Sequence, residues 1–411
     1  METALLAPSD RPLSDPIPGE AWPTWPQHTA DDVAAVASVL ESNEWGGAFA
    51  PAVVSFEAAW AKYVDARHAI SCSNGTVSLS IALQALGVGH GDEVIVPAYT
   101  FYATATAVLT AQAIPVFADV DPATLNLDPR HVEKLITPRT RAVIVVHFAG
   151  LAVDLDEIQR ICRQHGVSLI EDAAHAHGAE WRGRKVGTYG AFGSWSFQSS
   201  KNVTAGEGGA LTTNDPALAA RASSLRNCGR VPEGAWYEHH LLGGNHRMTA
   251  FQAALLLGAV ERLPEQFERR EVNARTLDVE LSSMPGLVPQ ARDSRHTAHA
   301  HHLYVFRVEP SDSAISRDEL IQRLQARGIP ATGGYPIALY RQPIFAEYRF
   351  SKEAVGWHNA KERQNYHDLR LAGTERICRE AVWLPHSLLL AEPRRMSEVV
   401  EAVAESLGEA G

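Results

Sequence analysis

The stretch GAFGSWSFQSSKNVTAGEGGALTT, residues 190–213, decides how the rest of this sequence is interpreted. Its pattern predicts a short strand, a loop that carries Lys201, a glycine-rich turn and a second strand. The serines and the glutamine ahead of the lysine are donors suited to an anion, and Gly206, Gly208 and Gly209 let the backbone turn sharply. A lysine held in such a loop can be a counter-charge for a phosphate or a nucleophilic amine. A partner elsewhere in the chain is needed to distinguish these two roles.

Upstream of this stretch, strand-like and helix-like segments alternate. The helix-like segments are amphipathic or apolar, and each follows a short apolar run with the composition of a buried strand. The predicted strands are AISCS (69–73), GDEVIVPAYT (91–100), IPVFADV (114–120), RAVIVVHFAG (141–150) and VSLIEDAA (167–174). This alternation predicts an α/β fold, with a mostly parallel central sheet covered by helices on both faces.

The chain is expected to divide into three parts. Residues 1–25 are rich in proline and predict an extended arm. Residues 26–270 are expected to form the large domain and residues 271–411 a smaller C-terminal α+β domain. Just before the second boundary, residues 249–263 predict a helix that is too apolar all round for an exposed surface.

Composition and charge exclude several classes of function. The chain has 411 residues, of which 45% are hydrophobic and 21% charged, and its formal net charge is −11. That charge gives no electrostatic support for binding nucleic acid or an anionic membrane. The four cysteines have no paired spacing, and no signal peptide or membrane-length apolar run is present. These features predict a soluble, cytoplasmic protein.

Asp172 and a strand-to-helix junction supply the partners that Lys201 needs. Asp172 ends a predicted buried strand, and Asn74-Gly75-Thr76 lies where another strand meets a helix. The free amides and positive dipole end of a helix N-terminus hold a phosphate, to which Ser196 could add a hydroxyl. In sheets of this kind, ligands collect beyond the carboxyl ends of the strands. A phosphate anchor, a carboxylate and a lysine are the parts needed to bind pyridoxal phosphate (PLP), with the carboxylate keeping the pyridine nitrogen protonated.

Five motifs resemble the DegT/DnrJ/EryC1/StrS family of fold-type I, PLP-dependent aminotransferases, which act on keto sugars and keto cyclitols. They stand in the family's order, and the resemblance extends from about residue 25 to the end of the chain. The motifs are GDEVIVPAYTFYATA (91–105), PVFADVDPATLNLDP (115–129), EDAAHAHGA (171–179), SFQSSKNVTAGEGGA (196–210) and GGNHRMTAFQAA (243–254).

The resemblance implies roles for individual residues. Lys201 matches the lysine that bonds covalently to the cofactor, Asp172 the partner of the pyridine nitrogen, and Phe101 the ring that stacks on the cofactor. His175 stands where many members have a glutamine that contacts the cofactor ring. Asn245 matches an asparagine that reaches the phosphate bound by the neighbouring subunit, which implies a homodimer with shared active sites. The positions matched to phosphate binding are Asn74, Gly75, Thr76, Ser196 and Gln198.

The same resemblance suggests a substrate class. Members that act on nucleotide sugars often have His-Tyr-Pro in the small domain, whereas this chain has Gly334-Tyr335-Pro336. Gln198 and the segment 204–209 instead look like the cyclitol and aminohydroxybenzoate branch. We therefore expect an aminotransferase that moves an amino group from L-glutamine or L-glutamate to a keto cyclitol such as scyllo-inosose in antibiotic biosynthesis. Arg247, which could meet the donor carboxylate, and Tyr335 are the candidate substrate contacts.

Alternative functions remain open at this point. The nearest are transamination of a nucleotide-linked keto sugar and an aromatising dehydration of the aminohydroxybenzoate-synthase type. A PLP-binding regulator would need a basic DNA-binding module, for which the acidic composition gives no support. The run RHTAHAHH, residues 295–302, invites a metal interpretation, but without supporting carboxylates or cysteines it predicts an exposed loop and no metal.

Overall fold

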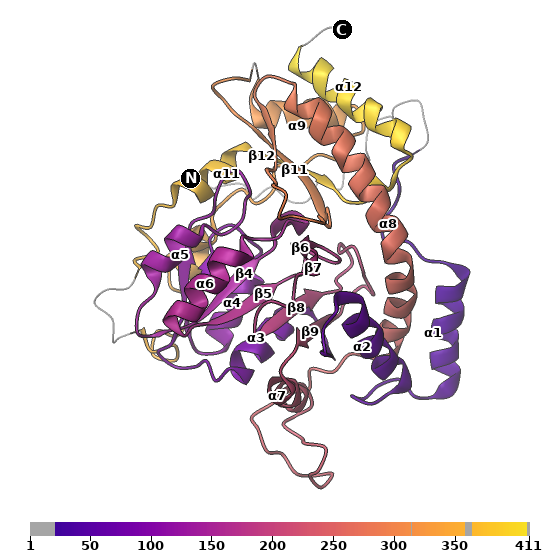
Figure 1. The fold of residues 1–411 in the computed structure, drawn as a ribbon, viewed down its shortest axis with the longest axis vertical. Coiled ribbons are helices and arrows are strands. Elements are labelled where there is room, and N and C mark those ends of the chain that lie inside the picture. Colours follow the sequence, from indigo (N-terminus) through magenta and orange to yellow (C-terminus); the bar gives the residue numbers. More distant parts are fainter. Residues whose placement is uncertain (1–20, 314, 358–363, 409–411) are drawn as a thin grey trace.

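The computed structural model describes residues 21–313, 315–357 and 364–408. Most of the predicted N-terminal arm, residues 1–20, lies outside the described residues. The chain forms a seven-stranded sheet in the order β1-β9-β8-β5-β4-β2-β3, a three-stranded sheet in the order β10-β11-β12, and a small β6-β7 pair (Figure 1). The predicted α/β fold with a mostly parallel sheet and a smaller C-terminal sheet is confirmed.

The large sheet contains both parallel and antiparallel strand pairs. The pairs β2-β3, β2-β4, β4-β5 and β5-β8 are parallel, and the pairs β1-β9 and β8-β9 are antiparallel. The strands are β1 His68–Cys72, β2 Glu93–Pro97, β3 Ile114–Ala118, β4 Thr140–Val146, β5 Ser168–Asp172, β6 Glu180–Trp181, β7 Arg184–Lys185, β8 Phe192–Ser196, β9 Gly209–Thr213, β10 Leu287–Pro289, β11 Leu303–Val308 and β12 Ala381–Pro385. The stretch at residues 190–213 thus forms two antiparallel strands joined by the loop that carries Lys201, as the sequence predicted.

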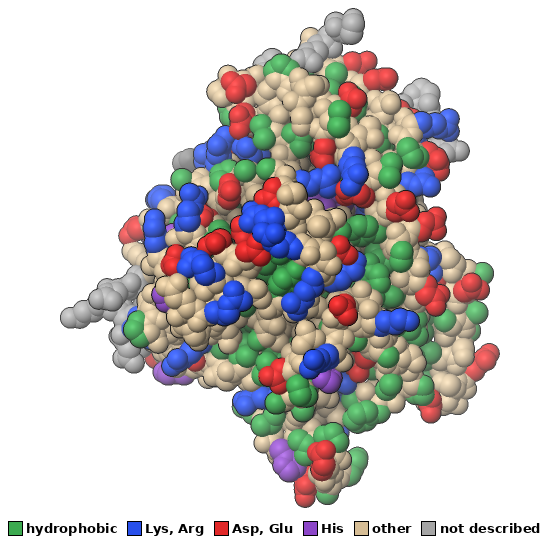
Figure 2. Space-filling view, viewed as in Figure 1, with side chains coloured by type: hydrophobic (Ala, Val, Ile, Leu, Met, Phe, Trp, Pro, Cys, Tyr) green, Lys and Arg blue, Asp and Glu red, His purple; other side chains and the backbone are tan. Residues whose placement is uncertain are grey.

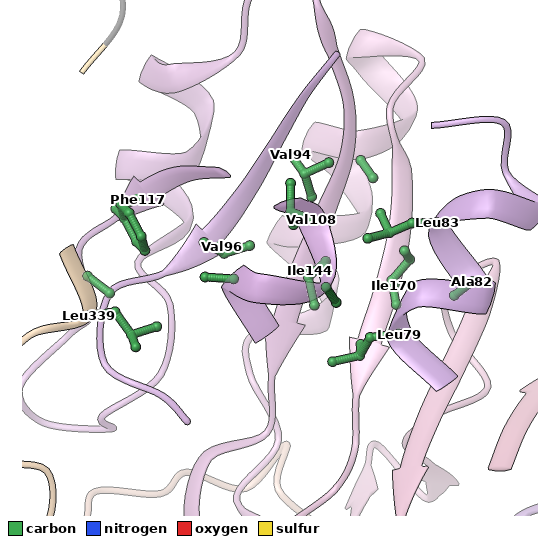
Figure 3. Close-up of a cluster of buried hydrophobic side chains, with 14 of the residues drawn as sticks. Leu79, Ala82, Leu83, Val94, Val96, Val108, Phe117, Ile144, Ile170 and Leu339 are labelled. Atoms are coloured by element: carbon green, nitrogen blue, oxygen red, sulfur yellow. The ribbon is translucent and has the colours of Figure 1, made fainter. Parts of the chain in front are cut away.

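Helices cover both faces of the large sheet because its strands are apolar on both sides. Val94, Val96 and Ile144 face one core together with α3 and α4, while Ile95 and Val143 face a second core together with α2 and α6. Figure 3 shows the first core between the strands and their covering helices. The helices are α1 Ala30–Ser42, α2 Pro51–Val64, α3 Gly75–Ala85, α4 Ala103–Thr110, α5 Pro129–Leu135, α6 Leu155–His165, α7 Pro216–Arg226, α8 Ala250–Ser282, α9 Arg317–Ala326, α10 Pro343–Ala346, α11 Ala372–Glu380 and α12 Met396–Leu407.

Helix α8 links the two sheets. It begins beside α1 and α2 and ends near α12 and the three-stranded sheet (Figure 1). Thr249 and Gln252 form a capping box at its start, which satisfies amides that would otherwise lack acceptors. The helix continues well beyond residue 263, where the sequence pattern ended it, and passes through residue 270. The division of the chain at that position therefore stays a prediction.

The surface carries charges of both signs. On the face shown in Figure 2, basic and acidic side chains lie next to one another and no region of a single sign dominates. Many of these charges form exposed ion pairs, such as that of Arg160 with Glu133 and Glu157. No helix in the described part of the chain is long and apolar enough to cross a membrane.

A cluster of aromatic side chains joins α2 to the strand that precedes the lysine loop. Phe56 and Trp60 both pack against Phe197, with ring centroids 5.3 and 5.2 Å apart, and Trp60 also meets Trp195 at 5.0 Å. Phe56 and Trp60 have no exposed surface. Rings of this size contribute strongly to a core when fully buried.

Replacing Phe56 with alanine is expected to lower the free energy of unfolding by about 3–5 kcal/mol, because it leaves a cavity in this cluster. Chemical denaturation monitored by circular dichroism measures the change. Phe49→Ala is the matched control, since Phe49 is 71% exposed, and it should change the free energy by less than about 0.5 kcal/mol. Equal effects of the two substitutions would contradict the assignment of this cluster to the core.

Candidate active site

A cavity of about 1140 Å³ opens beyond the carboxyl ends of β4, β5 and β8. Asp172 ends β5 and Ser196 ends β8, so the strand ends bring together residues far apart in sequence. Arg247 and Asn245 are the two predicted site residues that do not line the cavity. Ten predicted site residues do line it: Asn74, Gly75, Thr76, Phe101, Asp172, His175, Ser196, Gln198, Lys201 and Tyr335.

The N-terminus of α3 forms one end of the cavity. Asn74 caps the helix by accepting a hydrogen bond from the amide of Val77. In the part of the chain that the structure describes, the amides of Gly75 and Thr76 have no acceptor, and both residues line the cavity. A Cβ atom on Gly75 would lie 2.7 Å from Cβ of Ser196, so only glycine lets the helix start approach β8 this closely. The arrangement is suited to an anion with several oxygens.

Asp172 is buried and holds a defined set of hydrogen bonds. Its Oδ2 accepts from Oγ1 of Thr104 over 2.9 Å, and its Oδ1 accepts from the amide of Ala174 over 3.3 Å. Burial raises the pKa of this carboxyl, while Thr104, Ala174 and the charge of Lys201 act in the opposite direction. The carboxylate form therefore depends on donors that the fold supplies.

Lys201 lies in the wall of the same cavity. Burial lowers the pKa of its amine to about 8, and the negative charge of Asp172 opposes this shift. The main chain of the loop turns where Lys201 N donates to Gln198 O over 2.8 Å. The Gln198 side chain is engaged within the loop, since it bonds to Ser199 and Ser200. An amine with this pKa is partly neutral near pH 7–8 and can accept a proton or act as a nucleophile.

Aromatic side chains form the rim and one wall. Phe101 lies at the rim with 51% of its surface exposed. Tyr335 packs edge-on against Trp383, with ring centroids 4.8 Å apart, and Trp383 packs on Phe148 at 5.7 Å. Trp383 also lines the cavity, although nothing in its local sequence marked it as a site residue.

The prediction of an exposed loop for residues 295–302 is wrong. His299, His301 and His302 are buried, and His302 lines the cavity next to His175, with their ring centroids 4.2 Å apart. The run leads into the buried strand β11, so tertiary packing covers the histidines. Among the described residues, no group of three or more His, Cys, Asp or Glu side chains could hold a metal ion.

The hydrogen bonds of His302 define its tautomer. Nδ2 of Asn202 donates to the main-chain oxygen of Ala300 over 2.8 Å, which leaves Oδ1 to accept from Nδ1 of His302 over 3.0 Å. The lone pair of His302 is therefore on Nε2. Burial, followed by the nearby His175, holds the pKa of His302 well below its usual value. The cavity wall thus contains a neutral hydrogen-bond acceptor.

Asn245 and Arg247 do not line the cavity of their own chain. Asn245 is exposed and pairs with Asn227 in an isolated β-bridge. Nη1 of Arg247 donates to Oδ1 of Asn227 over 2.9 Å. Both residues lie near the end of the connection between α7 and α8, part of which projects from the body of the molecule (Figure 1).

Comparisons with known protein sequences identify a family of aminotransferases that this chain matches. The sequence model of the DegT/DnrJ/EryC1/StrS aminotransferase family matches residues 26–404. The chain is 45% identical over 309 residues to an L-glutamine:2-deoxy-scyllo-inosose aminotransferase of Micromonospora echinospora, a match that covers 72% of this chain and 73% of that protein. It is 37% identical over 391 residues to a 3-amino-5-hydroxybenzoate synthase of Amycolatopsis mediterranei, covering 95% and 98% of the two chains.

A solved structure has the same fold. The crystal structure of a 3-amino-5-hydroxybenzoic acid synthase superimposes with a TM-score of 0.85 at 35% sequence identity, covering 96% of this chain and all of the other. The similarity of fold therefore extends over nearly the whole chain.

Replacing Asp172 with asparagine is expected to lower the pKa of the Lys201 amine below its value of about 8, because the negative charge that favours the ammonium form is lost. Competitive acylation of the cofactor-free protein across a pH series, followed by mass spectrometry of the Lys201 peptide, measures the midpoint. Glu207→Gln is the control, since Glu207 also lines the cavity but does not contribute to the shift. A midpoint that rises or stays unchanged in the Asp172 variant would show that the two side chains do not interact.

Proposed function

The chain belongs to the DegT/DnrJ/EryC1/StrS aminotransferase family, and on this premise we propose that it moves an amino group from L-glutamine or L-glutamate to a ketone on a cyclitol. It is a PLP-dependent aminotransferase of the sugar and cyclitol class. The proposal concerns the acceptor, the donor and the residues that act on them. A place in the biosynthesis of aminocyclitol antibiotics is part of the same proposal.

The cavity fits the cofactor of the family. The free amides at the start of α3, with Ser196 beside them, suit the phosphate group, and the close approach of Gly75 to Ser196 keeps that cradle open. Asp172 would face the pyridine nitrogen, and Phe101 and His175 would contact the ring. When bound, PLP withdraws electrons from the carbon that carries the amino group.

Lys201 and Asp172 have separate roles in the proposed reaction. With PLP bound, the Lys201 amine would be its covalent attachment at rest and, once released, would move the proton from the α-carbon of the donor to the carbon of the cofactor that carries the nitrogen. Its lowered pKa leaves part of the amine neutral near physiological pH, as a base requires. Asp172 stays a carboxylate because Thr104 and the amide of Ala174 donate to it.

The packing of Gly334 is the observation that supports a cyclitol over a nucleotide sugar. Gly334 has a φ of 66°, and a Cβ atom there would lie 2.4 Å from Cε2 of Trp383. Family members that act on nucleotide sugars often carry histidine at this position, and with Trp383 in place no such side chain fits. The chain therefore cannot present a histidine at this position, which is the feature that favours a cyclitol.

The charges of the cavity wall also favour a neutral polyhydroxylated substrate. Among the described residues that line the cavity, Lys201 is the one basic side chain other than histidine. None of these described wall residues is an arginine that could bind a diphosphate or a ring carboxylate. His302 instead presents a neutral acceptor that suits a hydroxyl group.

A second candidate reaction is the aromatising dehydration of an aminohydroxybenzoate synthase. Similarity to a 3-amino-5-hydroxybenzoate synthase, found both in sequence and in structure, favours it. Its product carries a carboxylate, and the described residues that line the cavity of this chain include no arginine to bind it. Transamination of a cyclitol therefore remains the first proposal.

We further propose a homodimer in which each subunit completes the other's site. Asn245 and Arg247 lie outside the cavity of their own chain, and Arg247 has no carboxylate partner in the described residues. The projecting loop before them exposes Trp236, Tyr237 and Leu242, with Trp236 80% exposed. Apolar side chains on a projecting loop are typical of a contact with another chain. In a dimer, Asn245 would reach the phosphate and Arg247 the carboxylate of the amino donor.

A two-step titration tests the proposed acceptor. The PLP-loaded protein is treated with L-glutamine or L-glutamate until its visible absorbance band fades, and ketones are then added one at a time. We expect scyllo-inosose or another keto cyclitol to restore the band, while nucleotide-linked keto sugars leave it unchanged. Lys201→Ala, which should bind PLP but show no turnover, is the control. Recovery only with a nucleotide sugar would overturn the cyclitol assignment, and failure of both donors would overturn the choice of donor.

Replacing Thr104 with valine is expected to move the acid limb of the pH–kcat profile to higher pH. The substitution removes a hydrogen bond to the carboxylate, so the pKa of Asp172 rises further and the active carboxylate is lost at a higher pH. Below the limb, kcat should fall roughly 5-fold, as expected for one hydrogen bond of about 1 kcal/mol. Thr104→Ser should restore the profile, and Thr106→Val on the same helix should leave it unchanged. An unshifted limb in the Thr104→Val variant would contradict the role of Asp172.

A further inference from the structure

Arg270 is a buried cation without a carboxylate partner in the described part of the chain. It lies on α8 with no exposed surface, and its Nε and Nη1 atoms have no hydrogen-bond acceptor. Nη2 donates to Nδ1 of His386 over 3.2 Å, and the guanidinium lies 5.7 Å from the ring centroid of Trp25. Burial lowers the pKa of Arg270 to about 9. A charge buried without a carboxylate partner contributes little to the stability of the fold. We therefore looked for a role of Arg270 in the neighbouring active site.

The contact with Arg270 fixes the tautomer of His386. A guanidinium donates and never accepts, so Nδ1 of His386 must accept and the ring proton must be on Nε2. Nε2 then donates to the main-chain oxygen of Ser200 over 3.1 Å. His386 follows β12 directly and is 3% exposed. Burial and then the charge of Arg270 hold its pKa well below the usual value, so His386 stays neutral and keeps this tautomer.

Trp25 makes a similar hydrogen bond to the main-chain oxygen of the next residue in the loop, Lys201. Its Nε1 donates to the main-chain oxygen of Lys201 over 3.2 Å, and its ring packs edge-on against His386 with centroids 4.6 Å apart. The oxygens of Ser200 and Lys201 belong to the two peptide units that meet at Cα of Lys201. Because each unit is planar, holding both restricts φ and ψ of Lys201. The direction of its Cα–Cβ bond is then fixed.

Both contacts come from residues that pack on the part of the molecule that contains the three-stranded sheet. Trp22, on the same segment as Trp25, donates to the main-chain oxygen of Gly328 over 2.9 Å. The guanidinium of Arg395 lies 3.8 Å from the ring centroid of Trp22, which packs against the core of the three-stranded sheet. The residues that hold the lysine loop are thus anchored on the small sheet, whereas Asp172 belongs to the large one.

We propose that Trp25, His386 and Arg270 are positioning residues for Lys201. Trp25 and His386 hold the peptide units on either side of it, and Arg270 keeps His386 in the tautomer that can donate. The proposal rests on the proposed catalytic role of Lys201. An amine at the end of a long side chain reaches its target reproducibly only from a fixed main chain, and a misplacement of about 1 Å can slow a reaction about 100-fold.

Trp25→Phe tests the proposal because it removes the indole N–H and keeps a ring against His386. Trp22→Phe is the matched control, since it removes the same kind of hydrogen bond from the same segment without touching Lys201. With PLP-loaded protein, we expect kcat of the Trp25 variant to fall about 10-fold with KM within about 2-fold of the wild type. The Trp22 variant should stay within about 2-fold in both constants.

The second readout needs neither cofactor nor turnover. In the cofactor-free protein, the acylation midpoint of Lys201 should move to higher pH in Trp25→Phe, because a less firmly held amine is better hydrated, and stay unchanged in Trp22→Phe. The titratable side chains around the amine remain the same in both variants: Asp172, His175, His177, His302 and His386.

Arg270→Met provides an independent variant. Removing a buried charge without a partner should leave Tm unchanged or raise it, while kcat falls about 10-fold. A purely structural role would not combine these two results. Equal behaviour of the Trp25 and Trp22 variants in both assays, or wild-type kcat and midpoint in Arg270→Met, would overturn the proposal. If the wild type transaminated no ketone, the proposed function would fail, and the acylation midpoints would still decide this inference.

Discussion

The burial of Lys201 and Asp172 in one cavity wall is the constraint on which the site depends. Removal from water disfavours the charged form of each, so it lowers the pKa of the amine and raises that of the carboxyl. Their mutual attraction acts against both shifts. Hydrogen bonds from Thr104 and the amide of Ala174 add to the stability of the carboxylate alone. The balance leaves an amine that is partly neutral near physiological pH beside a carboxylate that can stay ionised.

Asp172 and Lys201 lie close together because the strand direction changes between β8 and β9. Asp172 ends β5, which is parallel to β8, whereas β8 and β9 are antiparallel and the loop between them carries Lys201. This loop returns close to the start of α3. A Cβ atom on Gly209 would lie 2.4 Å from the carbonyl carbon of Asn74, so glycine is required where β9 passes the helix start. The anion cradle and the lysine loop are therefore built on one closely packed unit.

Much of the fold and part of the site were predictable because their signals are local. Alternating strand-like and helix-like segments predicted the α/β sheet, and the motifs at the strand ends, together with the family resemblance, predicted ten residues that line the cavity. The exposed loop predicted for residues 295–302 was wrong, because the burial of His299, His301 and His302 depends on the elements that pack over them. The roles assigned to Asn245 and Arg247 stay predictions that concern a second subunit.

The sequence by itself determined the order of elements, the helix caps, the lysine and the carboxylate, because spacing and residue type specify these within a few turns of chain. Tertiary structure alone decided which side chains hold the main chain of the lysine loop. Trp25 and His386 contact the lysine loop from 176 and 186 residues away, and Trp383 fills the space beside Gly334. No local pattern marks such residues, since their partners meet only when the two sheets pack together. The substrate-facing wall therefore follows from the packing of the whole chain.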